Sequence, residues 1–138
     1  LAGIDPSEYP GSSFSDAQQG TWYSAYVQWA SGAGIVNGYG NNRFGPDDAV
    51  TREQMCVMLA RFMVHTGIIL PEINKNKVFT DRADISGWAL EAVGLCHRLG
   101  LVEGTGAGRF NPKGLATRAE VATIFKRFIE CVVKRPFQ

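Results

Sequence analysis

The chain of 138 residues lacks the features that mark several classes of protein. It has no apolar run of about 18 residues, which argues against a membrane-spanning helix. Neither sign of charge is in excess, because 14 Lys and Arg stand against 13 Asp and Glu, and so no strong field favours nucleic acid or an anionic membrane. With 45% apolar and 20% charged residues, the composition is close to that of soluble globular domains and excludes a mainly disordered or Pro-rich fibrous chain.

Cysteine is scarce, and its distribution argues against a disulfide framework. The three cysteines, Cys56, Cys96 and Cys131, are odd in number and far apart, and all stand in apolar helical stretches. We therefore expect them to be small core side chains. The chain starts at Leu1 and has no charged segment followed by an apolar one, so we expect a piece of a longer protein whose signal peptide lies outside it.

Motifs of enzymes and metal sites are also missing. Residues 104–108 (Gly-Thr-Gly-Ala-Gly) lack the preceding strand and the Lys-Ser/Thr of a phosphate-binding loop. Asp47 and Asp48 lack the alternating acidic pattern of a calcium loop, and His65 and His97 are not at metal-ligand spacing. We predict no catalytic site, metal or cofactor, although the segment can tether an enzyme encoded elsewhere in the same polypeptide.

The chain repeats itself at an offset of 66 residues. Residues 34–38 (Gly-Ile-Val-Asn-Gly) match 100–104 (Gly-Leu-Val-Glu-Gly), and 43–46 (Arg-Phe-Gly-Pro) match 109–112 (Arg-Phe-Asn-Pro). Further matches at this offset, or at 65, are Trp22 with Trp88, 50–52 with 116–118, and 14–16 (Phe-Ser-Asp) with 79–81 (Phe-Thr-Asp). So many matches in one register predict two copies of one structural unit.

Each copy has the pattern of a helix, a glycine-rich loop and a second helix. Gly34 and Gly100 stand where the first helices end, because glycine adopts a positive φ without strain. Residues 51–54 (Thr-Arg-Glu-Gln) and 117–120 (Thr-Arg-Ala-Glu) fit capping boxes that begin the second helices. The apolar stripes behind these boxes predict core packing: Met55, Met58, Leu59, Phe62 and Met63, then Val121, Ile124, Phe125, Phe128, Ile129 and Val132.

No strand-like alternation is found, so the predicted class is all-α. The predicted organisation is a leader at 1–13, a repeat at 14–66, a connector at 67–78, a second repeat at 79–133 and a tail at 134–138.

The order Phe-x-Asp, Trp, Gly-Ile-Val-x-Gly-Tyr, Arg-Phe-x-Pro and Thr-Arg-Ala-Glu resembles the S-layer homology (SLH) repeat. The first copy departs from it with Glu53-Gln54, and the second has Thr105 where the first has Tyr39. The resemblance implies tandem helix–loop–helix repeats. Family members commonly carry three, packed about a pseudo-threefold axis with binding grooves between neighbours. Here two are complete, so a third lies outside the segment, or the leader or a partner chain completes the core.

The resemblance also implies a function. Proteins similar to this one use such repeats as non-covalent anchors to the envelope of bacteria, mostly Gram-positive. The implied ligand is a secondary cell-wall polysaccharide linked to peptidoglycan, often bearing a pyruvate ketal. We therefore expect an extracellular module of a surface protein, located at the cell wall or S-layer, which binds an acidic glycan and neither binds nucleic acid nor spans a membrane.

A carboxylate carried by a sugar is suited to arginine, because the planar guanidinium donates two parallel hydrogen bonds to it. Arg52 and Arg118 stand at the first helical position, where free backbone N–H groups and the positive end of the helix also favour an anion. The other candidate ligand-binding residues are aromatic faces, glycines that permit close approach and acceptors for sugar hydroxyls: Trp22, Trp88, Tyr39, Gly38, Gly104, Asp16 and Asp81.

Each candidate also has a structural interpretation. The arginines can form ion pairs with Asp16, Asp81 or Glu120, the tryptophans can be partly buried anchors, the aspartates can be caps, and the glycines can be turn formers. For the chain as a whole, the alternatives are a structural or oligomerising module that binds no sugar, and a fragment of a glycan-active enzyme with a carboxylate pair in one cleft.

Overall fold

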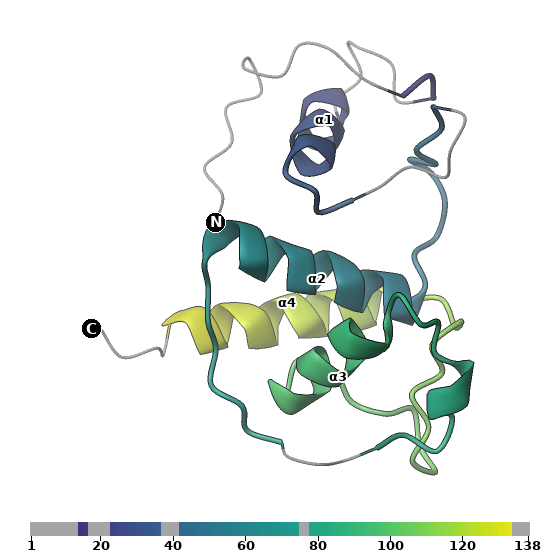
Figure 1. Cartoon of the computed structure of the whole chain (residues 1–138), viewed down its shortest axis with the longest axis vertical. Coiled ribbons are helices and arrows are strands. Elements are labelled where there is room, and N and C mark those ends of the chain that lie inside the picture. Colours follow the sequence, from purple (N-terminus) through teal and green to yellow (C-terminus); the bar gives the residue numbers. More distant parts are fainter. Residues whose placement is uncertain (1–13, 17–22, 37–41, 75–77, 134–138) are drawn as a thin grey trace. The chain divides into compact units, whose positions relative to one another are not determined.

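The computed structural model describes residues 14–16, 23–36, 42–74 and 78–133, and these residues hold helices but no strand (Figure 1). The elements are α1 (Ser24–Gly32), α2 (Arg52–Thr66), the 3-10 turn η2 (Arg82–Asp84), α3 (Leu90–Arg98) and α4 (Arg118–Val133). The all-α class is therefore confirmed. Within these ranges, no helix has the length and apolar character that crossing a bilayer requires.

The chain divides into two compact units, residues 1–48 and 49–138. The division falls between Asp48 and Ala49, inside the first sequence repeat. The long helix of the first repeat, α2, therefore belongs to the same compact unit as α3 and α4 of the second repeat. The repeat boundaries of the sequence mark copies of a pattern, whereas packing joins α2 to the copy that follows it.

In the first unit, the Phe-x-Asp segment holds the Arg-Phe-x-Pro loop. The ring of Phe14 lies 5.2 Å from that of Phe44, and the N–H of Ser15 donates to the carbonyl oxygen of Asn42 at 2.7 Å. The carboxylate of Asp16 accepts hydrogen bonds from the N–H groups of Phe44 and Gly45, at 2.7 and 2.8 Å. This segment therefore fastens a loop that lies far along the chain.

The second unit contains the same arrangement. The rings of Phe79 and Phe110 lie 5.1 Å apart, and the N–H of Thr80 donates to the carbonyl of Gly108 at 2.8 Å. The carboxylate of Asp81 accepts from the N–H groups of Phe110 and Asn111, both at 2.8 Å. The repeat seen in the sequence is thus a repeat of hydrogen bonds and ring contacts as well.

The core of the second unit lies between its three helices. Helix α2 packs against α3 (Figure 1). The rings of Phe62 on α2 and Phe128 on α4 meet edge to face at 6.0 Å. Cys56 and Cys96 are free and fully buried at the contact of α2 and α3, where the Cys96 thiol faces the Cys56 carbonyl at 3.6 Å. The neighbouring thiol and burial together raise the pKa of Cys56, so the prediction of core cysteines is confirmed for this pair.

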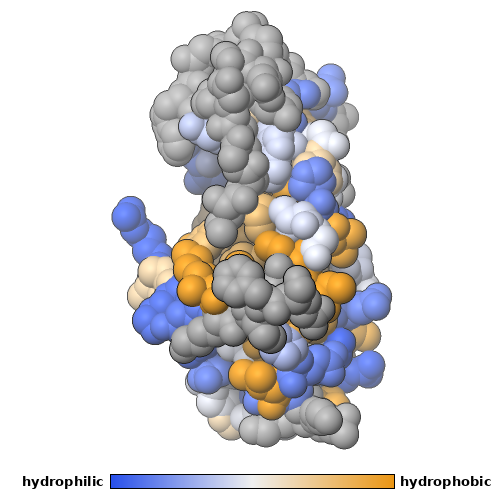
Figure 2. All heavy atoms as spheres, turned by 90° about the vertical axis from the view of Figure 1, so that its left-hand side faces the viewer, coloured by the Kyte–Doolittle hydropathy of each residue, from blue (hydrophilic) through white to orange (hydrophobic). Residues whose placement is uncertain are grey.

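Two expectations about burial are corrected. The stripes on α2 and α4 are only partly buried: Met55, Leu59, Met63, Ile124 and Phe128 are inside, whereas Met58 is 36%, Phe125 51% and Ile129 43% exposed. The stripes are wider than the surface that the neighbouring elements of this unit cover, and apolar side chains reach the face shown in Figure 2. Trp88, expected to be a partly buried anchor, is 61% exposed, because α3 begins at Leu90 and Trp88 stands in the turn before it.

Candidate functional site

The start of α2 is closed by internal hydrogen bonds. Both halves of the predicted capping box are present, with Thr51 Oγ1 accepting from the Gln54 N–H and Gln54 Oε1 accepting from the Thr51 N–H. The N–H groups of Arg52 and Glu53 donate to the carbonyls of Gly114 and Pro112, at 2.8 and 3.1 Å. The N–H groups of Arg52 and Glu53, expected to be free at this helix start, therefore donate to the loop of the second repeat.

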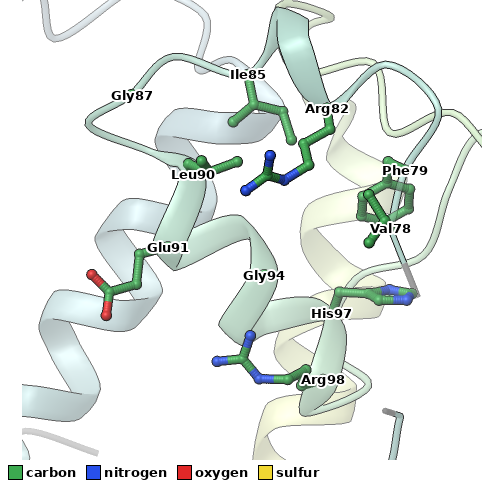
Figure 3. Close-up of a pocket in the computed structure, with 10 residues that line it drawn as sticks. All are labelled: Val78, Phe79, Arg82, Ile85, Gly87, Leu90, Glu91, Gly94, His97 and Arg98. Atoms are coloured by element: carbon green, nitrogen blue, oxygen red, sulfur yellow. The ribbon is translucent and has the colours of Figure 1, made fainter. Parts of the chain in front are cut away.

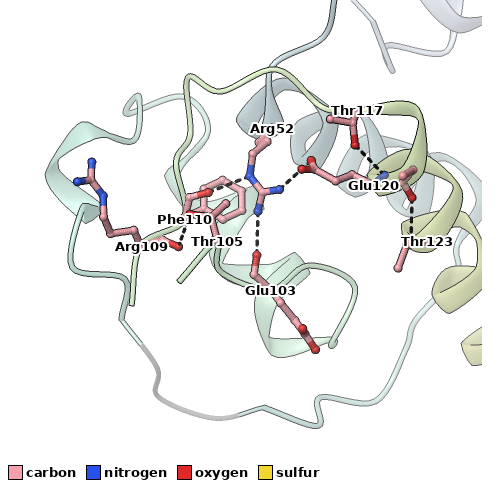
Figure 4. A network of polar contacts seen from close by, with 9 residues as sticks. Arg52, Glu103, Thr105, Arg109, Phe110, Thr117, Glu120 and Thr123 are labelled. Carbon is pink, nitrogen blue, oxygen red and sulfur yellow. Dashed lines mark hydrogen bonds and ion pairs between the residues drawn. The ribbon is translucent and has the colours of Figure 1, made fainter. Parts of the chain in front are cut away.

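The guanidinium of Arg52 is also used inside the protein, and the residue is only 7% exposed. Its Nε donates to the Phe110 carbonyl, its Nη2 to the Glu103 carbonyl and its Nη1 to the Glu120 carboxylate, each at 2.8 Å (Figure 4). The cation also lies 4.8 Å from the centre of the Phe110 ring. Of the ion-pair partners that the sequence leaves open, Glu120 is the one that Arg52 has.

The backbone of Phe110 connects two of the candidate residues. Its N–H donates a hydrogen bond to the Asp81 carboxylate, and its carbonyl accepts one from Arg52 Nε. Burial alone raises the pKa of Asp81, but the N–H groups of Phe110 and Asn111 outweigh it and hold the pKa below its usual value. The N–H groups of Phe44 and Gly45 lower the pKa of Asp16 in the same way. Each aspartate thus holds a loop in place through two hydrogen bonds from backbone N–H groups.

Replacing Asp81 with Asn is expected to lower the free energy of unfolding by about 1–3 kcal/mol near pH 7, because one buried N–H loses its acceptor. The folded state holds the Asp81 pKa below the unfolded value of about 3.9, so this stabilisation is present above that pH and disappears as the pH falls through the lowered folded-state pKa. Urea unfolding of the wild type and the variant measures this effect. The difference between their free energies of unfolding is expected to be smaller near pH 3 than near pH 7. A difference of equal size at both pH values would contradict this role.

A buried carboxylate on α2 was not predicted from the sequence. Glu53 is 2% exposed, and its carboxylate accepts from the N–H and hydroxyl of Ser86 and pairs with Lys113 at 2.5 Å. Burial raises the pKa of Glu53, but the hydrogen bonds from Lys113 and Ser86 lower it below its usual value. The departure from Thr-Arg-Ala-Glu at position 53 was the available signal, because a Glu in place of Ala there needs a partner.

The start of α4 differs from that of α2. Thr117 Oγ1 accepts from the Glu120 N–H at 3.1 Å, so half of the predicted box is present, while the Glu120 carboxylate accepts from Arg52 (Figure 4). Arg118 is exposed, and neither its side chain nor the N–H groups of Arg118 and Ala119 have a partner within the described part of the chain. Among the residues described, this helix start offers an open cation and two free N–H groups.

The remaining candidates are scattered. A Cβ at Gly104 would lie 2.7 Å from the Arg109 carbonyl oxygen, so the loop requires glycine there, and Trp88 is exposed in the turn before α3. Trp22, Gly38 and Tyr39 lie outside the described residues. The structure thus brings Arg52 and Asp81 together at Phe110 and gives them internal partners.

No group of His, Cys, Asp and Glu that could hold a metal ion occurs where the chain is described.

Comparison with known proteins gives matches along most of the chain. The profile of the S-layer homology domain matches residues 13–56 and 78–122. "Exoglucanase XynX" of Acetivibrio thermocellus is 36% identical over 130 residues, which are 94% of this chain and 12% of that protein. "Amylopullulanase" of Thermoanaerobacterium thermosulfurigenes is 37% identical over 130 residues, 94% of this chain and 7% of that protein. "S-layer protein" of Bacillus thuringiensis subsp. finitimus is 31% identical over 120 residues, 86% of this chain and 14% of that protein.

Proposed function

The chain belongs to the S-layer homology domain family, and on that basis we propose that it is a non-catalytic module that anchors a surface protein to the bacterial cell wall. Its ligand is an acidic secondary cell-wall polysaccharide, with a pyruvate ketal as the carboxylate group. Because the chain spans only 12% and 7% of the two enzymes it matches, the activities in their names are those of the larger proteins. The module acts outside the cell, at the wall or S-layer.

The contrast between the two Thr-Arg motifs supports the proposal. Arg52 is 7% exposed and donates to three internal oxygen atoms, so its position is explained without a ligand. Arg118 begins α4 at the same place in the repeat, but it is exposed and without a partner in the described ranges. A cation at the positive end of a helix is unfavourable by a few tenths of a kcal/mol, and a bound anion would remove that penalty.

The chemistry of the contact follows from the groups at the start of α4. A carboxylate on a sugar accepts two parallel hydrogen bonds from the guanidinium of Arg118, and the N–H groups of Arg118 and Ala119 are oriented toward an anion in front of the helix. The exposed face of Trp88 is available to the apolar side of a sugar ring. Asp16 and Asp81 act by holding loops, whereas the roles of Trp22, Tyr39, Gly38, Gly104 and Arg52 toward a ligand stay predictions.

Arg118→Gln is expected to weaken binding to purified cell-wall sacculi about tenfold or more, because hydrogen bonds to charged groups contribute about 1.5–3 kcal/mol each. Arg118→Lys is expected to recover only part of the affinity, because an ammonium group keeps the charge but cannot donate in a planar fork. The measurement is a co-sedimentation titration of each variant with sacculi, together with a far-UV circular dichroism spectrum.

The matched control is Lys126→Gln, which removes the same charge from an exposed position on the same helix. This variant is expected to bind within about twofold of the wild type, because Lys126 has its own partner in Glu130, in an exposed pair that contributes little. Equal weakening by both variants would indicate a general effect of charge. Unchanged binding of Arg118→Gln would contradict the assigned contact.

The second candidate function is a structural or oligomerising module, and one observation favours it. The loop of the following repeat covers the start of α2. The side chain of Arg52 donates to the Phe110 carbonyl, and the backbone N–H of Arg52 donates to the Gly114 carbonyl. By the same logic, Arg118 can bind the loop of a further repeat or of a second copy. Light scattering at increasing protein concentration distinguishes the two functions: a dimer that Arg118→Gln dissociates favours assembly, and a monomer favours the glycan.

A further inference from the structure

Two of the three cysteines meet in the core of the second unit. Cys56 stands in α2 and Cys96 in α3, and both residues are fully buried. The Cys96 thiol lies 3.6 Å from the Cys56 carbonyl oxygen, and the Cys96 side chain is the largest cause of the raised pKa of Cys56. The packing of α2 on α3 therefore places side by side two thiols that are 40 residues apart in the sequence.

The pattern that the two repeats share does not require a thiol at either position. At the offset of 66 residues, Cys56 corresponds to Ala122 and Cys96 corresponds to Ala30. Ala122 stands in α4 and Ala30 in α1, so the equivalent helices form with a methyl group at these places. The chain thus has cysteine in place of alanine at two positions, and these two positions meet in space. One buried cysteine is an ordinary core residue, whereas two that meet can be joined covalently.

The surroundings of the two thiols decide when they can react. A thiolate is the reactive form of cysteine, and the raised pKa of Cys56 keeps it a thiol in the folded protein. Both residues are 0% exposed, so a reagent in solution does not reach them in the closed structure. Cys96 does not line the pocket beside α3 either, because the residues of this helix that line it are Leu90, Glu91, Gly94, His97 and Arg98 (Figure 3).

We propose that Cys56 and Cys96 form a disulfide bond that joins α2 of the first sequence repeat to α3 of the second. The bond forms while the chain folds, before α3 closes over α2, and burial then protects it from reductants. Disulfides persist in proteins outside the cell. The inference therefore rests on the location that we propose for this module, but not on any contact with a glycan.

The oxidant is a disulfide of low molecular weight in the surroundings. One cysteine thiolate attacks a sulfur atom of this oxidant, which forms a mixed disulfide and releases one small thiolate. The second cysteine thiolate attacks the cysteine sulfur of the mixed disulfide and releases the other small thiolate. The two protons of the cysteines pass to the two released thiolates. The cysteine pair is thus oxidised by two electrons, and the small disulfide is reduced to two thiols.

The bond closes a loop of about 40 residues, and this restricts the unfolded chain. The two sequence repeats are already joined by the hydrogen bonds of Arg52 and by the contact of α2 with α3. A disulfide at this contact keeps the helices together when the second unit opens. The melting temperature of the oxidised chain is therefore expected to be about 10 °C or more above that of the reduced chain.

The test uses the whole chain, refolded in a buffer of reduced and oxidised glutathione, alkylated with iodoacetamide and digested with trypsin. Cleavage after Lys and Arg places Cys56 in the peptide 53–61, Cys96 in 83–98 and Cys131 in 128–134. Mass spectrometry is expected to find 53–61 linked to 83–98, with 128–134 outside the link. Alkylation of both Cys56 and Cys96, or a link through Cys131 in their place, would overturn the proposal.

Two variants make the change in melting temperature specific. The double variant Cys56→Ala and Cys96→Ala places in both positions the residue that the other repeat has, and it is expected to melt at the same temperature with and without dithiothreitol. The control Cys131→Ala removes the third thiol and is expected to keep the difference of about 10 °C. A difference that persists in the double variant, or that is lost in Cys131→Ala, would count against the bond.

The peptide analysis needs only the wild-type chain, so it decides the proposal even where a variant does not fold. Binding to sacculi is a separate measurement with a separate outcome. A chain without the bond that still binds sacculi overturns the disulfide alone, and a linked chain that does not bind them overturns the anchoring function alone.

Discussion

Arg52→Ala is expected to lower the free energy of unfolding of the second unit by about 3 kcal/mol, because it removes a buried guanidinium that donates to three oxygen atoms. The variant would leave the carbonyls of Phe110 and Glu103 without their donors and the carboxylate of Glu120 without its cation. It would also remove the contact between the guanidinium and the Phe110 ring. All three oxygen atoms belong to the second repeat, so Arg52 fastens α2 to the repeat that follows it.

The comparison with Arg118→Ala makes this prediction specific. Arg118 has the same neighbours in sequence, Thr before and a helix after, but it is exposed, and its substitution is expected to change stability by less than about 0.5 kcal/mol. Arg52→Lys should fall between wild type and Arg52→Ala, because a single ammonium group replaces a fork that reaches three acceptors. Urea unfolding followed by circular dichroism measures all three variants. Equal destabilisation by Arg52→Ala and Arg118→Ala would show that burial does not distinguish the two arginines.

The parts of the fold that depend on local sequence could be predicted. Thr51 and Gln54 form the expected capping box, and Gly34 and Gly100 follow their helices with φ of 75° and 73°. These features are decided within a few residues of chain, where capping chemistry and the absence of a Cβ dominate. The repeat register likewise predicted which segments would be equivalent, and the matched hydrogen bonds of Asp16 and Asp81 follow that register with the one-residue difference seen in the sequence.

The different environments of Arg52 and Arg118 could not be predicted, because their local sequences are nearly the same. What separates them is which loop packs in front of each helix: the loop with Gly114 and Pro112 covers the start of α2. The exposure of Trp88 could not be predicted for a similar reason, since the sequence does not show that α3 begins two residues after it. His97 was considered only as a metal ligand, and its spacing does not show that its ring lies buried against Phe79.

The division of the chain into units also depends on packing rather than pattern. The sequence repeats at 14–66 and 79–133 are copies of one pattern, and α2, which ends the first copy, packs on α3 of the second copy within one unit. A repeat of this kind buries its long helix against the neighbouring copy, as the contact of Phe62 with Phe128 illustrates. The exposed Phe125 and Ile129 on α4 show that the second unit by itself does not cover the whole of its apolar stripe.

The largest effect on binding is expected when the polysaccharide is removed from the cell wall. We propose that the chain anchors a surface protein through an acidic wall polysaccharide. The most direct measurement compares co-sedimentation of the wild-type chain with intact sacculi that carry a pyruvylated wall polysaccharide and with the same sacculi after hydrofluoric acid has removed that polymer. Removal of the polymer is expected to abolish binding, because the bare peptidoglycan no longer presents the ketal carboxylate to which Arg118 would donate. Binding of equal strength to intact and stripped sacculi would contradict it.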